Sequence, residues 1–196
     1  MTDDRGQAFT LEAFTASLLL IGSIIFALQV TAVTPLTAST SSQHIENQQQ
    51  QVAAGLLDSA VSNGSLKEAL LYWNDSGGHF AAADSEDGYY TSGGPPNAFG
   101  KMLNRTFRDR GIAFDVNVWF VTTSNTVRRE QLVNFGTPSD NAVSARRTVT
   151  LYDDDRLTAP GFSAELSDTS NYFARDIAPD SGVYTVVRVE VIVWRM

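Results

Sequence analysis

The chain has 196 residues, of which 43% are hydrophobic, and this is enough apolar material for one folded domain with an appended segment. Its formal net charge of −8 argues against nucleic acid as a partner, because neutralising a phosphate backbone requires an excess of Lys and Arg. The absence of cysteine excludes disulfides, thiolate catalysis and cysteine-based metal sites.

The first predicted element is an apolar helix close to the N-terminus. Residues 13–33 read AFTASLLLIGSIIFALQVTAV and contain no charged residue. At about 1.5 Å of rise per residue, a helix of this length spans roughly 31 Å, which is the thickness of the hydrocarbon core of a bilayer. We therefore predict a membrane-spanning helix.

Three interpretations of this segment remain open. It is a cleaved secretory signal, a plain anchor that keeps Met1, or the processed anchor of a filament subunit. A secretory signal has a basic start, a shorter apolar core and a small-x-small cleavage site. Here the start, MTDDRG, is acidic on balance and the apolar run is long, although Val30-Thr31-Ala32 fits a cleavage site.

The third interpretation depends on the residues just before the apolar run, Arg5-Gly6-Gln7-Ala8-Phe9-Thr10-Leu11-Glu12. This stretch resembles the class III signal of type IV pilins and archaellins, in which a short polar leader ending in a basic residue and Gly is removed. The resemblance implies a leader at residues 1–6, cut by a prepilin peptidase between Gly6 and Gln7, and a transmembrane or filament-core helix at residues 7–35. Glu12 then becomes the sixth mature residue, whereas bacterial pilins carry Glu at the fifth.

Glu12 is the predicted subunit contact. A carboxylate at the edge of an apolar helix is costly unless it is paired or reaches the headgroups. The resemblance implies that the free N-terminal amine of a neighbouring subunit is the partner; alternatively, Glu12 marks the membrane boundary beside Arg5. The leader contains Arg5, and no Lys or Arg follows before Lys67, so the charge bias is slight. Taken together with the leader pattern, it predicts a cytoplasmic N-terminus and an extracellular bulk.

Residues 36–64 are predicted to form an amphipathic helix or stalk, with Pro35 kinking or interrupting the helix before it. Its apolar positions recur at helical spacing: Ile45, Val52, Leu56, Leu57, Ala60 and Val61. Gly64 is the predicted stop. The four glutamines at 48–51 could instead form a flexible tether. A further helix is predicted over Leu66–Trp73, with Ser65 as its N-cap.

Residues 65–196 are predicted to form an extracellular α+β domain. Residues 74–96 are rich in Gly, Asp and Ser and predict an exposed loop, and Asn97 is expected to cap a helix that ends at Gly111. Alternating apolar residues predict strands at 112–120, 146–152 and 183–194. The predicted fold class is thus α+β: a long N-terminal hydrophobic helix, then an antiparallel sheet of three to five strands with short helices.

Three sequons agree with an extracellular location. Asn63, Asn74 and Asn104 each begin an Asn-X-Ser/Thr sequon and are possible glycosylation sites. The chain has two lysines against twelve arginines, and Asp outnumbers Glu by about two to one. Such Lys-poor, Asp-rich surfaces resemble those of proteins from salt-loving organisms, where screening removes the penalty of like charges.

The sequence predicts no catalytic residue, no metal site and no cofactor. His44 and His79 are the only histidines and lie in no metal-binding spacing. Two acidic clusters, at 84–88 and 153–155, do not follow the twelve-residue calcium loop. The resemblance of the leader to type IV pilins implies a structural subunit of an archaeal type IV pilus-like filament, whose partners are the membrane, other pilin-like subunits and the peptidase. The alternative is a monomeric, single-pass envelope or binding protein that does not polymerise.

Overall fold

The computed structural model describes the backbone of residues 4–195 and the side chains of residues 9–29 and 43–195. The chain forms two compact units that divide between Ile45 and Glu46. Helix α1 (Asp4–Ser62) contributes to both. The interruption expected at Pro35 is wrong, because α1 is helical on both sides of this residue. The loss of one backbone donor is thus not sufficient to end the helix.

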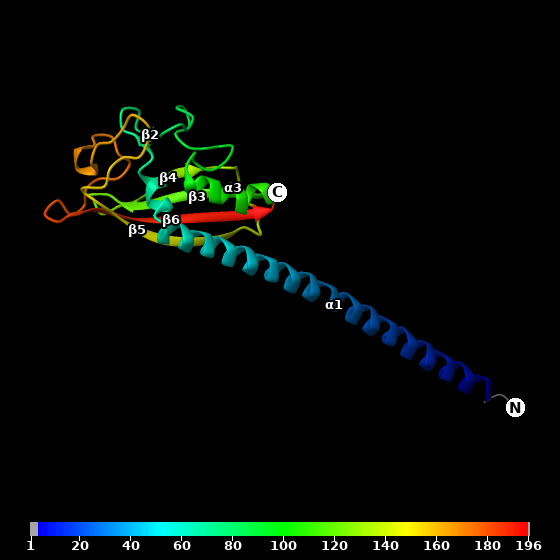
Figure 1. Ribbon diagram of the computed structural model, residues 1–196. Coiled ribbons are helices and arrows are strands. Elements are labelled where there is room, and N and C mark those ends of the chain that lie inside the picture. The colour runs from blue at the N-terminus through cyan, green and yellow to red at the C-terminus, as the bar shows by residue number, and fades with distance from the viewer. Residues whose placement is uncertain (1–3, 196) are drawn as a thin grey trace. The chain divides into compact units, whose positions relative to one another are not determined.

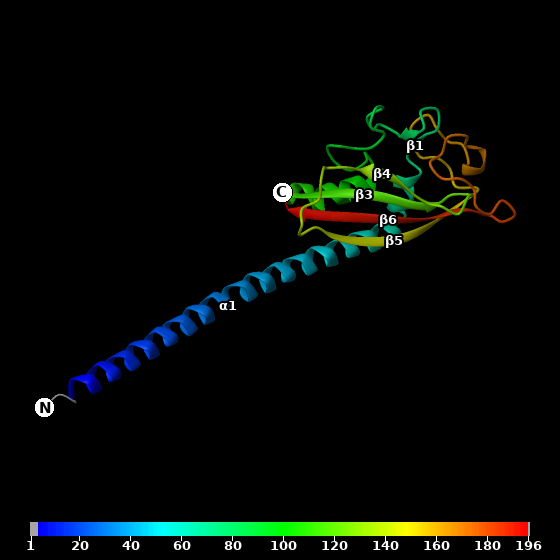
Figure 2. The ribbon, with the colours of Figure 1, turned by 180° about the vertical axis from the view of Figure 1, so that it is seen from behind.

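The second unit is built on a four-stranded antiparallel sheet, and this confirms the predicted α+β class. The strands are β3 (Ile112–Val121), β4 (Val127–Val133), β5 (Val143–Tyr152) and β6 (Val183–Arg195), in the order β4-β3-β6-β5 (Figures 1 and 2). The last strand of the chain is therefore central in the sheet. Three of the four strands were predicted, and β5 begins three residues earlier than expected.

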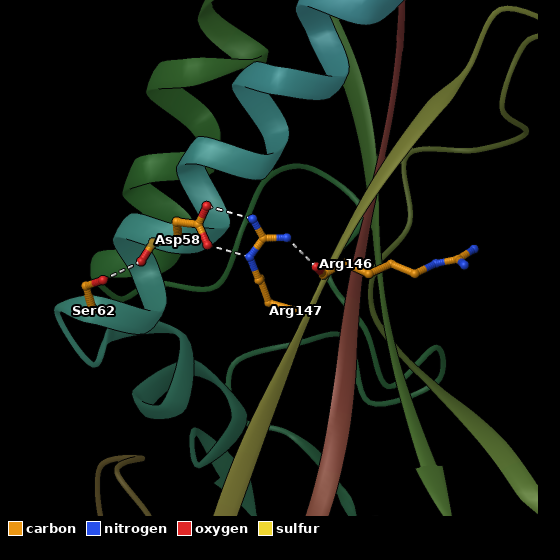
Figure 3. A network of polar contacts seen from close by, with 4 residues as sticks. All are labelled: Asp58, Ser62, Arg146 and Arg147. Carbon is orange, nitrogen blue, oxygen red and sulfur yellow. Dashed lines mark hydrogen bonds and ion pairs between the residues drawn. The ribbon is translucent and has the colours of Figure 1, made fainter.

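One face of the sheet carries the hydrophobic core. Val189, Val191 and Val193 of β6 are fully buried and lie opposite Val118, Val116 and Phe114 of β3. Buried residues of three helices complete this cluster: the second half of α1, α2 (Ser65–Leu70) and α3 (Ala98–Thr106). Figure 3 shows α1 and α3 on the same side of the sheet. The strand β3 is buried on both faces, although its sequence predicted burial on one face only.

The turns between helices differ in detail from the prediction. Gly64 follows α1 as expected, and its positive φ of 77° explains the choice of glycine. Helix α2 is shorter than predicted and ends at Leu70. Ser65 is not its N-cap: the backbone N–H of Ser65 donates to Asn63 Oδ1 at 2.9 Å. Asn97 caps α3 as predicted, accepting from the Gly100 N–H at 3.2 Å, and the helical turn η1 (Arg108–Arg110) follows.

The segment 74–96 is not the fully exposed loop that its composition indicates. Two strands of two residues each, β1 (Trp73–Asn74) and β2 (His79–Phe80), form a hairpin, and Trp73, Phe80 and Tyr90 are buried. The rings of Trp73 and Phe80 meet edge to face, 5.0 Å apart, and Trp73 Nε1 donates to the Asn171 carbonyl at 3.1 Å. A few aromatic residues are thus enough to fold a Gly- and Asp-rich segment onto the core.

Candidate functional site

The most prominent functional feature of the first unit is an apolar stretch of α1. Residues Phe9–Gln29 are long and apolar enough to cross a membrane, and none of their side chains is buried. The side chains of Phe9 and Leu19 are 71% and 76% exposed. A surface of this size is unfavourable in water, because exposed apolar patches of soluble proteins rarely exceed a few hundred Å². The stretch is therefore long enough and apolar enough to be buried in lipid.

Three hydroxyl groups in this stretch form hydrogen bonds within the helix. Ser17 Oγ donates to the Phe14 carbonyl and Ser23 Oγ to the Leu20 carbonyl, both at 2.8 Å. Thr15 Oγ1 donates to the Glu12 carbonyl at 2.9 Å. Such bonds remove the cost of placing a hydroxyl in an apolar environment, so the polar residues do not oppose burial in lipid or among helices.

The predicted processing and contact residues lie at the start of α1. Arg5, Gly6 and Gln7 are helical, and their side chains fall outside the described residues. The Glu12 side chain is exposed and forms no ion pair with any described side chain. A charge-pairing role for Glu12 thus requires a group from another molecule or from the leader.

The three sequons occupy different environments. Asn63 is exposed in the turn between α1 and α2. Asn74 in β1 and Asn104 in α3 are half-buried, and their Oδ1 atoms accept from the N–H groups of Gly77 at 2.9 Å and Gly94 at 3.0 Å. All three asparagines use the side-chain oxygen for local structure, and Asn63 is the most accessible of them to a modifying enzyme.

A polar network that the sequence did not predict crosses the other face of the sheet, here called the open face, which is turned away from α1 and α3. Glu190 of β6 is only 5% exposed there. Trp119 Nε1 donates to Glu190 Oε2 at 3.0 Å, and Arg146 Nε donates to Oε1 at 2.7 Å. The guanidinium of Arg129 lies 6.0 Å from the centre of the Trp119 ring. The four strands thus contribute one residue each to a single chain of contacts.

Two neighbouring residues of β3 extend this polar layer. Asp115 and Asn117 are buried on the open face, and Asn117 lies opposite Glu190. Burial raises the pKa of the Asp115 carboxyl, although the Phe135 N–H donates to its Oδ1 at 2.7 Å and partly offsets this effect. Asn117 Oδ1 is buried without a hydrogen-bond partner. These carboxylates are held by structural contacts, and no cluster of three or more metal-ligating side chains occurs among the described residues.

A polar cleft of about 450 Å³ lies beside the loop after β2. It brings together one acidic and one basic residue with the half-buried sequon asparagine: Asp84, Arg108 and Asn104. Tyr89, Thr91 and Ser92 add hydroxyl groups. Asp84, the first residue of the acidic cluster at 84–88, therefore forms part of the cleft wall. Its Oδ1 also accepts a hydrogen bond from the Glu86 N–H at 2.9 Å.

Comparison with known protein families assigns the chain to one of them. The sequence profile of the family of unknown function DUF7288 matches residues 5–193, so the chain belongs to this family. No curated protein and no solved structure matched the chain. The match begins at Arg5 and ends within β6, so it includes both the apolar stretch of α1 and the sheet.

Proposed function

We propose that this member of DUF7288 is a structural, type IV pilin-like subunit of an archaeal surface filament. In this proposal the N-terminus is cytoplasmic, the apolar stretch of α1 lies in the membrane before assembly and in the filament core afterwards, and the outer domain is presented for contact or adhesion. One observation carries the proposal. A single helix supplies both an uncovered apolar stretch, Phe9–Gln29, and a packed segment of the folded domain.

The packed segment of α1 is attached to the sheet by core and surface contacts. Ala53, Leu57 and Ala60 have no solvent exposure. The guanidinium of Arg147 binds both carboxylate oxygens of Asp58 in a fork, and Figure 3 shows it reaching from β5 toward α1. This arrangement favours a stalk over a flexible tether at 48–51. A filament subunit needs such an attachment so that packing of the helices in the filament core also positions the outer domains.

The sequence of the leader supports the same proposal. Cleavage between Gly6 and Gln7 by a prepilin peptidase would create a free amine close to Glu12. If helices from several copies bundle with little water nearby, an unpaired carboxylate would cost several kcal/mol, and a partner amine from the next copy relieves this cost.

The first test is the identity of the mature N-terminus. We expect N-terminal sequencing of membrane-extracted protein to begin at Gln7, and Gly6→Val to block the cleavage. A start at Val33 or Ser39 would instead indicate secretory cleavage, and an intact Met1 would indicate a plain anchor.

The second test replaces Glu12 by Gln, which keeps the shape and removes the charge. We expect Glu12→Gln to insert in the membrane normally and to be depleted in filaments sheared from the cell surface. Ser17→Ala is a matched control in the same helix, because the Ser17 hydroxyl bonds only to its own backbone. Equal recovery of wild type and Glu12→Gln would refute the pairing role. Absence of the chain from sheared filaments would favour the alternative, a monomeric membrane-anchored envelope or binding protein.

A further inference from the structure

One end of the outer domain carries an excess of unpaired positive charge. We call it the basic end; it consists of Lys101 and Arg105 in α3 and Arg108 and Arg110 in η1. None of the four takes part in an ion pair with a described residue, and Asp109 is the single acidic residue among positions 98–112. This concentration is unusual in a chain with a net charge of −8.

The loop between β5 and β6, residues 153–182, carries the opposite charge, and we call it the acidic end. Two of its carboxylates are neutralised, Asp155 by Lys67 at 2.6 Å and Glu165 by Arg156. Five others form no ion pair with a described residue: Asp153, Asp154, Asp168, Asp176 and Asp180. Arg175 is the one cation of the loop that is also free of an ion pair within the described chain.

These two ends are too far apart to neutralise each other within one copy. The acidic loop finishes at Gly182, directly before β6, whereas η1 directly precedes β3, whose Ile112 pairs with Arg195 at the other end of β6. The thirteen residues of β6 extend over roughly 40 Å at about 3.3 Å per residue. Figures 1 and 2 show the loop and α3 at opposite ends of the sheet. The complementary charges can therefore meet only between copies.

The two ends also match in apolar surface. A groove of about 500 Å³ lies between α1 and α3, lined by Val52, Leu56 and Met102 and bordered by Lys101 and Arg105. The Val52 side chain is 40% exposed in this groove. The acidic end presents one large exposed aliphatic side chain, Ile177, which is also 40% exposed and stands between Asp176 and Asp180. An apolar anchor flanked by carboxylates thus has a matching apolar groove flanked by cations.

We propose that a second copy of this chain docks its segment 176–180 on this groove. Ile177 enters the groove, and Asp176 and Asp180 face Arg105 and Lys101. The contact joins two different surfaces, so it repeats from copy to copy and does not close into a symmetric dimer. It rests on the proposed filament function and specifies which surfaces of the outer domains meet. In molar salt the Debye length falls to about 3 Å, so only directly touching charges contribute and Ile177 supplies the part that screening does not weaken.

Cross-linking of the full chain in its cells tests the contact, and the absence of native cysteine makes the result easy to interpret. The double variant Ser59→Cys/Ser181→Cys places one thiol in the groove and one beside the acidic segment without changing a charge. A short thiol-reactive cross-linker is expected to give a ladder of dimers, trimers and higher species. The control is Ser59→Cys/Ser124→Cys, because Ser124 is exposed in the β3–β4 turn at the same end of the sheet as the acidic loop. No ladder, or an equal ladder from the control, would overturn the inference.

A charge exchange tests the pairing itself in the same cross-linkable background. Lys101→Asp and Asp180→Lys are each expected to reduce the ladder severalfold, and their combination is expected to restore it. Asp168→Lys, an exposed change in the same loop, should leave the ladder unchanged. A combination that fails to restore the ladder would overturn the assigned contact. A ladder in membranes, with no chain in sheared filaments, would refute the filament and keep the contact, so the two proposals fail in different ways.

Discussion

Replacing glycine by alanine should have opposite effects at two helical positions of the outer domain. In an ordinary helix this change is stabilising by roughly 0.5–1 kcal/mol, because glycine loses more backbone freedom on folding. At Gly55 in α1, an added Cβ would meet nothing within 4 Å. Gly55→Ala should therefore raise the free energy of unfolding by about that amount.

At Gly100 in α3 the same change meets the backbone of the preceding loop. The added Cβ would lie 1.8 Å from the Pro95 carbonyl oxygen and 2.7 Å from the Pro95 nitrogen. Neither atom belongs to a flexible side chain, so the loop or α3 must move, and overpacking of this kind typically costs about 1–3 kcal/mol. We expect Gly100→Ala to lower the free energy of unfolding by about 2 kcal/mol, a difference of about 3 kcal/mol between the variants.

Urea unfolding of the fragment from Gln43 onward, followed by circular dichroism, measures both free energies. The slope of the transition should be the same for the two variants, because neither changes the surface exposed on unfolding by much. If Gly100→Ala were as stable as Gly55→Ala, the close approach of α3 to Pro95 would be refuted. Because Lys101 and Arg105 lie in the same helix, their placement beside the groove would then lack structural support.

Three further predictions use the same fragment. Leu57→Ala should lower the free energy of unfolding by about 3 kcal/mol, because Leu57 is fully buried. Val61→Ala, at a position that is 42% exposed, should lower it by less than about 1 kcal/mol. Similar losses for both variants in urea unfolding would contradict the packing of α1 on the sheet. Burial raises the pKa of Asp115 above 3.8, so the wild type should lose stability as pH rises from there toward the raised value, and Asp115→Asn should gain over wild type across that window in pH-dependent melting. The melting temperature should climb from low to molar salt as the acidic excess is screened, and a flat response would count against a salt-adapted surface.

The elements that the sequence predicted best are those whose pattern is local. The apolar stretch of α1, the alternation of β3 and β6 and the Asn97 cap all depend on residues within a few positions of each other. The edge strand β4 escaped prediction because its first residues, including Arg128 and Arg129, are exposed and charged. An edge strand is protected from unwanted pairing by such charges, and these same charges hide its alternation.

The open-face network shows a different limit of sequence reasoning. Glu190 alternates with buried valines along β6, and a charged residue in such a position ordinarily faces solvent. It is buried because Trp119 and Arg146, which are distant in the sequence, pack over it from the neighbouring strands. The sequence does not predict the complementary basic and acidic ends for the same reason. Only the pairing of Ile112 with Arg195 shows which loops lie at which end of the sheet.

The position of β6 in the sheet determines when the outer domain can fold. Ribosomes make a chain from its N-terminus, so the apolar stretch of α1 emerges before the strands and β6 emerges after β3, β4 and β5. Both β3 and β5 pair with β6 and not with each other, and three of the four strands therefore have no complete sheet to join until the thirteen residues of β6 are made. Pairing of strands so distant in sequence is also intrinsically slow. The sheet therefore forms after the apolar helix has been made, and a chain that lacked β6 would keep this helix but lose the strand on which the sheet is built.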